Sequence, residues 1–233
     1  MSGLGILFRK ELQASFGSPI AYTVAAVFLL VLGYTFSLTL FATKVANLNY
    51  IFHQMFVLSV LLVPALTMRA FAEERRSGTI ELLLTAPVEE IWIVLAKVGA
   101  ILALVLGMYA VTGIYGLILE VHGEPDWGPI FGGYLALVLL AVLLVSLGVM
   151  ISSLTENQVV AAAGSLGLFL MLWFADSVSS ILPQPFDTIA INFSLIGHFH
   201  PIATGSLFLS DAGYFVTLSL FGLFLTALRL RAR

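Results

Sequence analysis

Phe71-Ala-Glu-Glu-Arg-Arg-Ser-Gly-Thr-Ile-Glu-Leu-Leu-Leu-Thr-Ala-Pro87 is a polar segment, dense in charges of both signs, between two apolar runs of the chain. The runs extend over about residues 51–71 and 91–118, and each is long enough to cross a membrane as a helix, which takes about 20 apolar residues. A membrane protein that carries such a segment on a short internal loop typically uses it as a docking surface.

The composition is that of an integral membrane protein. Of the 233 residues, 60% are hydrophobic and only 10% are charged, and the mean hydropathy is +1.07. Soluble domains carry about 25% charged residues, so we do not expect a water-soluble fold. The chain contains no cysteine, which excludes disulfides, thiolate chemistry and cysteine-ligated metals.

Four further apolar runs bring the number of expected spans to six. They lie at about residues 20–41, 129–153, 158–180 and 212–230. Prolines and glycines break the segment 181–211, so we expect it to be external or re-entrant, with any irregular backbone at membrane depth covered by protein. The sequence therefore predicts an all-α fold with one six-span transmembrane domain over residues 1–233.

The distribution of basic residues predicts the orientation. Six spans place both termini on one side, and nine of the ten Lys and Arg residues then lie on that side, with only Lys44 opposite. Because cytoplasmic loops are enriched in Lys and Arg, we expect both termini and the polar segment to be cytoplasmic. The chain is thus expected to be a multi-pass protein of the cytoplasmic (inner) cell membrane.

Residues 3–17 precede the first span and have the pattern of an amphipathic helix that lies in the membrane interface. Arg9 and Lys10 lie on its polar face, whereas Glu11 falls near the apolar stripe and makes the pattern imperfect. The alternative is an ordinary basic flank that only sets the topology. The apolar positions of this stripe are Leu4, Leu7, Phe8, Leu12 and Phe16.

Within the polar segment, the residue order predicts a turn followed by a short helix. Gly78 permits a sharp turn, Thr79 is a competent N-cap, and Glu81 falls in the first turn, where the helix dipole favours an anion. Three leucines then follow at residues 82–84, and Pro87 ends the helix. An exposed leucine cluster on a surface helix fits a groove on a soluble partner. The alternative is a polar loop that serves only topology.

The second cytoplasmic loop, residues 152–158, is much shorter. Thr155 and Gln158 have the spacing of a capping box, which would begin the fifth span. A partner contact at Glu156 is the alternative function of this loop.

Small residues mark the start of the fifth span, where helices can approach closely. Ala161, Gly164 and Ser165 are typical of such a contact. Packing within the chain and packing against a second copy are both consistent with them.

The spans lack the residues that ion-driven transport and catalysis require. No Asp, Glu, Lys or Arg falls in the middle third of any expected span, and Lys97 and Arg69 lie near cytoplasmic ends, from which they can snorkel to water. The chain also has no phosphate-binding loop for ATP and no intramembrane protease pattern. Any work that the protein does must therefore draw its energy from a partner.

These residues resemble the permease subunits of ABC-2-type ABC transporters. The resemblance rests on the segment Phe71–Pro87 followed by Lys97, and on Phe8-Arg9-Lys10-Glu11-Leu12 ahead of the first span. Shorter strings resemble the gliding-motility-type branch of that family. They are Asp126-Trp127-Gly128-Pro129-Ile130, Ser153-Leu154-Thr155-Glu156-Asn157-Gln158 and His198-Phe199.

The resemblance implies a non-catalytic subunit that pairs with a second permease copy and binds two cytoplasmic ATPase subunits, which hold ATP and Mg²⁺. The segment 72–87 would be the coupling helix, with a second ATPase contact at Thr155 and Glu156. No nucleic acid partner and no metal are implied. The residues expected to couple to the ATPase are Glu73, Glu74, Arg75, Gly78, Thr79, Glu81, Leu82 and Leu83.

The expected function is ATP-driven export of a substrate that the sequence does not specify. One alternative is a mechanotransmitting subunit that acts on an extracytoplasmic auxiliary protein without bulk transport. A further alternative is a stand-alone channel or membrane scaffold, which would need no ATPase.

The orientation can be tested because the chain is free of cysteine. Single cysteines at positions 74 and 156 should react with an impermeant thiol reagent only after cells are permeabilised, whereas cysteines at 126 and 187 should react in intact cells. Labelling of position 74 from outside would reverse the orientation.

Overall fold

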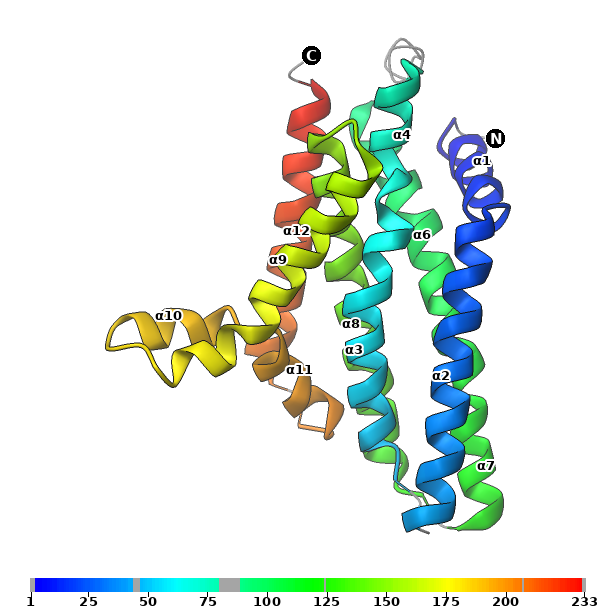
Figure 1. Cartoon of the computed structure of the whole chain (residues 1–233), viewed down its shortest axis with the longest axis vertical. Helices are drawn as coiled ribbons and strands as arrows, with labels where there is room; N and C mark the ends of the chain where they lie inside the picture. The colour runs from blue at the N-terminus through cyan, green and yellow to red at the C-terminus, as the bar shows by residue number, and fades with distance from the viewer. Residues whose placement is uncertain (1–2, 44–46, 80–88, 124, 207, 232–233) are drawn as a thin grey trace.

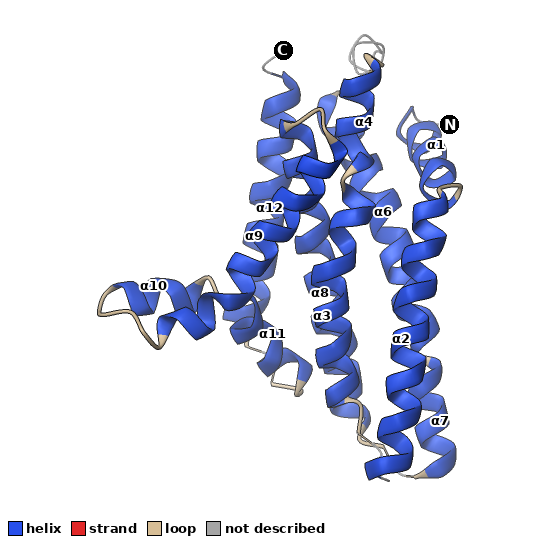
Figure 2. Cartoon of the chain, viewed as in Figure 1, coloured by secondary structure: helices blue, strands red, loops and turns tan. Residues whose placement is uncertain are grey.

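A computed structural model describes residues 3–43, 47–79, 89–123, 125–206 and 208–231 of the chain. Helices make up nearly all of this part, and it contains no strand (Figure 2). The helices are α1 (Gly3–Phe16), α2 (Pro19–Thr43), α3 (Asn49–Thr67), α4 (Arg69–Ser77), α6 (Glu90–Thr112), α7 (Ile114–His122), α8 (Trp127–Leu154), α9 (Gln158–Ser179), α10 (Phe186–Asn192), α11 (Leu195–Ala203) and α12 (Leu209–Arg231).

Six helical stretches in the described residues are long and apolar enough to cross a membrane. The prediction of an all-α, six-span fold is therefore confirmed. Two of the stretches comprise a pair of helices, α3 with α4 and α6 with α7. The stretches are Pro19–Ala42, Asn49–Ser77, Glu90–Val121, Trp127–Leu154, Gln158–Ser179 and Leu209–Arg231.

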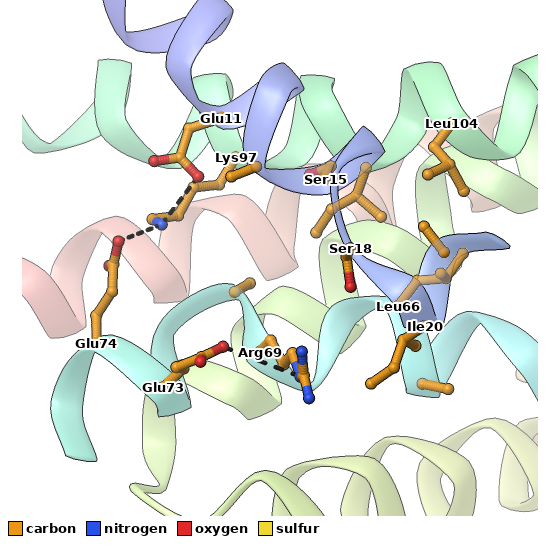
Figure 3. A pocket seen from close by; sticks show the side chains of 15 residues that line it. Glu11, Ser15, Ser18, Ile20, Leu66, Arg69, Glu73, Glu74, Lys97 and Leu104 are labelled. Carbon is orange, nitrogen blue, oxygen red and sulfur yellow. Dashed lines mark hydrogen bonds and ion pairs between the residues drawn. The ribbon is translucent and has the colours of Figure 1, made fainter. Parts of the chain in front are cut away.

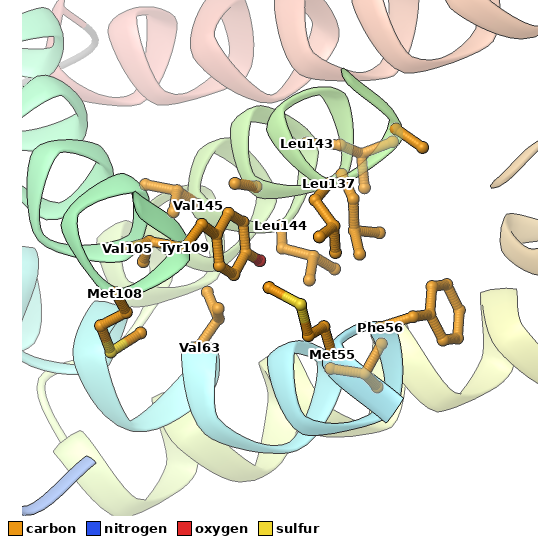
Figure 4. Packing of buried hydrophobic residues seen from close by; sticks show 14 of the residues in the cluster. Met55, Phe56, Val63, Val105, Met108, Tyr109, Leu137, Leu143, Leu144 and Val145 are labelled. Carbon is orange, nitrogen blue, oxygen red and sulfur yellow. The ribbon is translucent and has the colours of Figure 1, made fainter. Parts of the chain in front are cut away.

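Helix α8 is the central element of the bundle, in contact with α3, α4, α6, α9, α11 and α12. Its leucines and valines interdigitate with Met55 and Phe56 of α3 and with Tyr109 of α6 (Figure 4). A hydrogen bond of 2.6 Å joins the hydroxyls of Tyr109 and Ser59 across α6 and α3. A second hydrogen bond, of 3.1 Å, joins the hydroxyls of Thr112 in α6 and Tyr134 in α8. The core is thus apolar with a few polar contacts between helices, as expected for helices packed in lipid.

Two glycines of α8 allow α3 to approach closely. A Cβ at Gly133 would overlap the ring of Phe52, and one at Gly148 would overlap the side chain of Thr67. Both neighbours are buried, so neither can move aside without displacing others. The contact between α3 and α8 therefore depends on the absence of a side chain at these two positions.

Figure 1 shows α1, α4, the turn between α8 and α9, and the last turns of α12 at one end of the bundle, which we call the basic end. Apart from Lys44 and Arg233, which are outside the described residues, all Lys and Arg residues lie on elements at this end. Helix α1 is viewed nearly end-on while α2 runs along the long axis, so α1 crosses the bundle at a steep angle.

The segment expected to be external or re-entrant contains two short helices, α10 and α11. Helix α10 projects sideways from the bundle (Figure 1), whereas α11 packs against α8, α9 and α12. Helix α10 has no buried residue. Helix α11 is tied to α12 by His198, whose Nδ1 lies 2.8 Å from Asp211 Oδ1 and whose ring stacks on Tyr214.

The substitution Gly148→Ala tests the close approach of α3 and α8. The new Cβ has no space beside buried Thr67, so overpacking should lower the free energy of unfolding by about 1–3 kcal/mol. Thermal unfolding of the purified protein would measure the loss. Gly107→Ala is the control, because a Cβ there meets nothing within 4 Å and alanine has the higher helix propensity. Equal effects at both positions would contradict the packing argument.

Candidate functional site

A buried cation lies at the centre of the basic end. Lys97, two turns into α6, has only 4% of its side chain exposed. Its Nζ donates to Glu74 Oε1 of α4 at 2.7 Å and to Glu11 Oε2 of α1 at 3.2 Å (Figure 3). We call these three residues the Lys97 triad. The expectation that Lys97 snorkels to water is wrong, because two carboxylates solvate its ammonium inside the protein.

The triad exists because α1 lies directly against α6. Gly99 provides the space for this contact, since a Cβ there would come within 3.1 Å of the Phe8 ring. The same packing turns Glu11 toward α6, which explains why this acidic residue interrupts the apolar stripe of α1. Phe71 adds a ring centroid 5.2 Å from the Lys97 ammonium, a favourable cation–π distance.

The charges of the triad do not balance. One ammonium faces two carboxylates, and the exposed fractions of Glu11 and Glu74 are only 13% and 20%. Removal of a cation from such a group is costly, because the remaining charges are poorly solvated. The triad therefore holds α1, α4 and α6 together. Its own net charge is −1, and a further cation, the exposed Lys10, has its Nζ 3.9 Å from Glu11 Oε1.

Ser152 of α8 fixes the junction between α3 and α4. Its Oγ accepts from the backbone N–H groups of Phe71 and Ala72, at 3.1 Å each, and donates to the carbonyl of Met68 at 2.9 Å. A side chain inserted into the backbone hydrogen bonds of a helix is a common cause of a bend. Helix α4 therefore starts where Ser152 holds it, and its base cannot shift without α8.

The turn between α8 and α9 supplies a second tie. Arg69 Nε donates to Gln158 Oε1 at 3.2 Å, so Gln158 is not the partner of Thr155. The predicted capping box is wrong. Asn157 caps α9 by accepting from the Val159 N–H. The N-cap is thus two residues later than Thr155, and Gln158 is the first residue of α9, where it cannot complete a capping box.

The first half of the polar segment is helical. Residues 71–77 belong to α4, which continues the second span, whereas the sequence predicted mixed charge ahead of a separate helix. Gly78 ends α4 with φ of 73°, in the left-handed region that favours glycine, so the turn predicted there is present. Residues 72–77 of the coupling helix predicted over 72–87 therefore belong to α4, and residues 80–88 lie outside the described part.

The structure separates the residues expected to couple to an ATPase. Glu73, Gly78 and Thr79 are exposed, whereas Arg75 is buried and Glu74 belongs to the triad. Glu81, Leu82 and Leu83 lie outside the described residues. In the second loop, Glu156 is exposed and Thr155 is partly exposed.

The three small residues of α9 that were expected at a helix contact also differ in their burial. Ala161 and Ser165 are fully buried within the chain, and the Ser165 hydroxyl donates to the Ala161 carbonyl. Gly164 is exposed. Of the three, only Gly164 offers surface to a second copy.

The comparison with protein families assigns the chain. A family model described as ABC-2 family transporter protein matches residues 13–226. The chain belongs to the ABC-2 family. It is therefore a multi-pass transporter component of a membrane, and its family implies association with an ABC ATPase subunit. No curated protein matches the chain.

Sequence reasoning missed how the central residues of this ABC-2 protein are connected. Lys97 and Glu11 were each noted as irregular, one in an apolar run and the other in an apolar stripe. Two residues of opposite charge that each interrupt an apolar pattern indicate an ion pair. The pair between Lys97 and Glu11 could therefore have been predicted from the sequence. Ser152 gave no such signal, because a serine at a helix end is common.

Replacement of Lys97 by methionine tests the triad. The variant leaves Glu11 and Glu74 without their cation, and loss of one partner of a buried pair costs about 3 kcal/mol or more. We expect a large drop in the thermal unfolding temperature of the purified protein. Combining it with Glu11→Gln and Glu74→Gln should restore most of the loss, because all three positions of the triad are then neutral.

The control is Arg76→Met, which removes an exposed cation from α4 and should have little effect. If Lys97→Met is as stable as the parent, the triad does not hold the three helices together.

Proposed function

We propose that this ABC-2 protein is the permease subunit of an ATP-driven exporter of the cytoplasmic membrane, with its basic end in the cytoplasm. It works as a dimer with two ATPase subunits, which bind ATP and Mg²⁺. The observation that supports coupling best is the set of bonds around α4. That helix leads into the predicted docking segment, and it is bonded to α6 and α1 through the Lys97 triad and to α8 through Ser152.

These bonds suit α4 to transmit force. A helix that is tied at its base and along its side moves as a rigid piece with its neighbours, because packed interiors resist compression. A push on the segment after Gly78 would therefore reach α8, the central helix of the bundle. The ATPase supplies the energy, and the permease supplies only the connection.

The docking surface comprises the exposed residues of the basic end together with the predicted leucine cluster. Glu73 lies on α4, Thr79 follows the end of α4, and Glu156 lies in the turn between α8 and α9. Helix α4 and this turn lie at the same end of the bundle (Figure 1). Glu81, Leu82 and Leu83 would supply the apolar anchor for the ATPase groove. One ATPase could thereby contact both loops.

A second copy would cover the least buried spans. Helices α2 and α9 both pack on α3. In the apolar stretch of each helix, only 22% of the residues are buried within the chain. Exposed Gly164 lies on α9, where a partner helix could approach closely. Lipid covers whatever part of these faces the dimer leaves open.

The rival function is mechanotransmission to an extracytoplasmic auxiliary protein. The sideways arm of α10 favours it, because Phe186, Ile189 and Ile191 are each at least half exposed. Bulk substrate flux into vesicles separates the two functions. We also propose, from the strings around Asp126, Ser153 and His198, that the chain is related to the gliding-motility-type branch of the family. This relationship does not specify a substrate.

Docking and transmission can be separated by two sets of variants. Glu81→Gln with Leu83→Ala should weaken ATPase binding about ten- to hundredfold, because truncation of one hot-spot residue costs about 1–3 kcal/mol. Pull-down affinity and ATP turnover of the reconstituted complex measure the effect. Asp126→Asn is the control, since asparagine caps α8 as well as aspartate does. Parental binding by the docking variant would refute the assignment.

Ser152→Ala should behave differently. It removes the tie between α4 and α8 but leaves the exposed surface unchanged, so the ATPase should bind with parental affinity while transport per ATP falls. Loss of binding in this variant would show that Ser152 supports the docking surface and not the transmission of force.

A further inference from the structure

A cavity of about 280 Å³ opens beside the Lys97 triad, between α1, α2, the α3–α4 junction and α6. Its walls are formed by helices that the triad holds in place. Neither the docking surface nor the α4 connection uses this space.

The lining of the cavity changes from charged to apolar along its length. Figure 3 shows Glu11, Glu74 and Lys97 at one side, and Leu104, Leu66 and Ile20 at the other. The serines at positions 15 and 18 lie between the two groups. The apolar residues come from the first turn of α2, the last turns of α3 and the body of α6, which are parts of membrane spans. Such a lining fits a molecule with a polar head and an apolar tail.

The charged side of the cavity carries an excess of negative charge. Three carboxylates (Glu11, Glu73, Glu74) and two cations (Arg69, Lys97) line it, so the lining itself has a net charge of −1. Arg69 lies 3.9 Å from Glu73, so the net charge of the lining falls on the triad. Lys10 lies 3.9 Å from Glu11 but is exposed and does not line the cavity, so water screens its charge. Glu74 Oε2 is buried, and it has no hydrogen-bond partner among the described residues. A buried acceptor of this kind is costly unless a donor reaches it.

We propose that the cavity binds the ammonium-bearing head group of a membrane amphiphile. An ammonium supplies both a positive charge to balance the net negative charge of the lining and the donor that Glu74 Oε2 lacks. Ligand pockets for whole small molecules begin at about 300 Å³, so this cavity takes a head group while the tail runs along the apolar wall into the membrane. The shared chemistry is a primary ammonium on an apolar chain, from a phospholipid or from a single-chain amine.

Charge and hydrogen bonding together define the selectivity. An anionic head group would add to the excess negative charge. A quaternary ammonium has the charge but no N–H to donate. Phosphatidylethanolamine and dodecylamine should therefore bind, and phosphatidylglycerol and dodecyltrimethylammonium should not.

The test uses the full-length protein in phosphatidylcholine nanodiscs that contain a phosphatidylethanolamine with a photoreactive acyl chain. Illumination followed by peptide mass spectrometry should place the label on the segments that carry Ile20, Leu66 and Leu104. Unlabelled phosphatidylethanolamine should compete, which would identify a phospholipid head group; stronger competition by dodecylamine would identify single-chain amines. Equal competition by phosphatidylglycerol or by the quaternary amine would overturn the proposal.

Variants locate the binding to the cavity. Glu74→Gln and Glu11→Gln each remove the excess charge and should lower labelling about tenfold, as expected for loss of one charge-assisted hydrogen bond. Ala65→Leu fills the apolar side while leaving every carboxylate in place, and it should abolish labelling. Glu89→Gln removes an exposed carboxylate of the same end and should change nothing. Thermal unfolding of each variant checks that the fold is retained.

Equal labelling of Ala65→Leu and the parent would show that the lipid binds elsewhere. If the ATPase instead inserts a basic side chain, the label would be absent and a cysteine at position 65 would crosslink to the ATPase, which also overturns the proposal. Labelling is measured without the ATPase. Amphiphile binding can therefore fail while the proposed coupling to the ATPase holds, and coupling can fail while amphiphile binding holds.

Discussion

Lys97 cannot remain alone where the chain places it. An ammonium buried in a membrane-spanning helix costs several kcal/mol unless opposite charges solvate it. The protein meets this constraint with one carboxylate from α1 and one from α4. Helix α1 must then lie against α6, and α4 must extend as a helix beyond the second span. The arrangement of the basic end follows from the neutralisation of one cation.

The α3–α4 junction is subject to a second constraint, since backbone groups near lipid need partners inside the protein. Ser152 provides them at the bend, and the glycines of α8 bring α3 close enough for that serine to reach. Close packing and backbone hydrogen bonding therefore act on the same pair of helices. The result is a block of α3, α4 and α8 that cannot bend freely at its joint, as the transmission of force requires.

The spans could be predicted from the sequence because the length of an apolar run directly reflects the thickness of the membrane. The connections at the basic end could not. Charged residues at 73–76 resemble a loop, yet they are helical because Ser152 and Lys97 anchor them. Gln158 resembles a capping residue until Arg69 approaches it from a distant part of the chain. The cavity depends on four elements packing at particular angles, which no local pattern encodes.

Glu74 both connects α4 to Lys97 and lines the cavity, so force transmission and amphiphile binding would share this residue. A movement of α4 that draws Glu74 away from Lys97 would also remove a wall of the cavity and one of its two acceptors. An amphiphile that bridges Glu11 and Glu74 would then favour the position of α4 seen in the structure. Because coupling between two binding events is reciprocal, any change that ATP causes in amphiphile affinity must be matched by an equal effect of the amphiphile on ATP binding. On the two proposals together, the net negative charge of the cavity lining would make the lipid surroundings a determinant of the ATPase cycle.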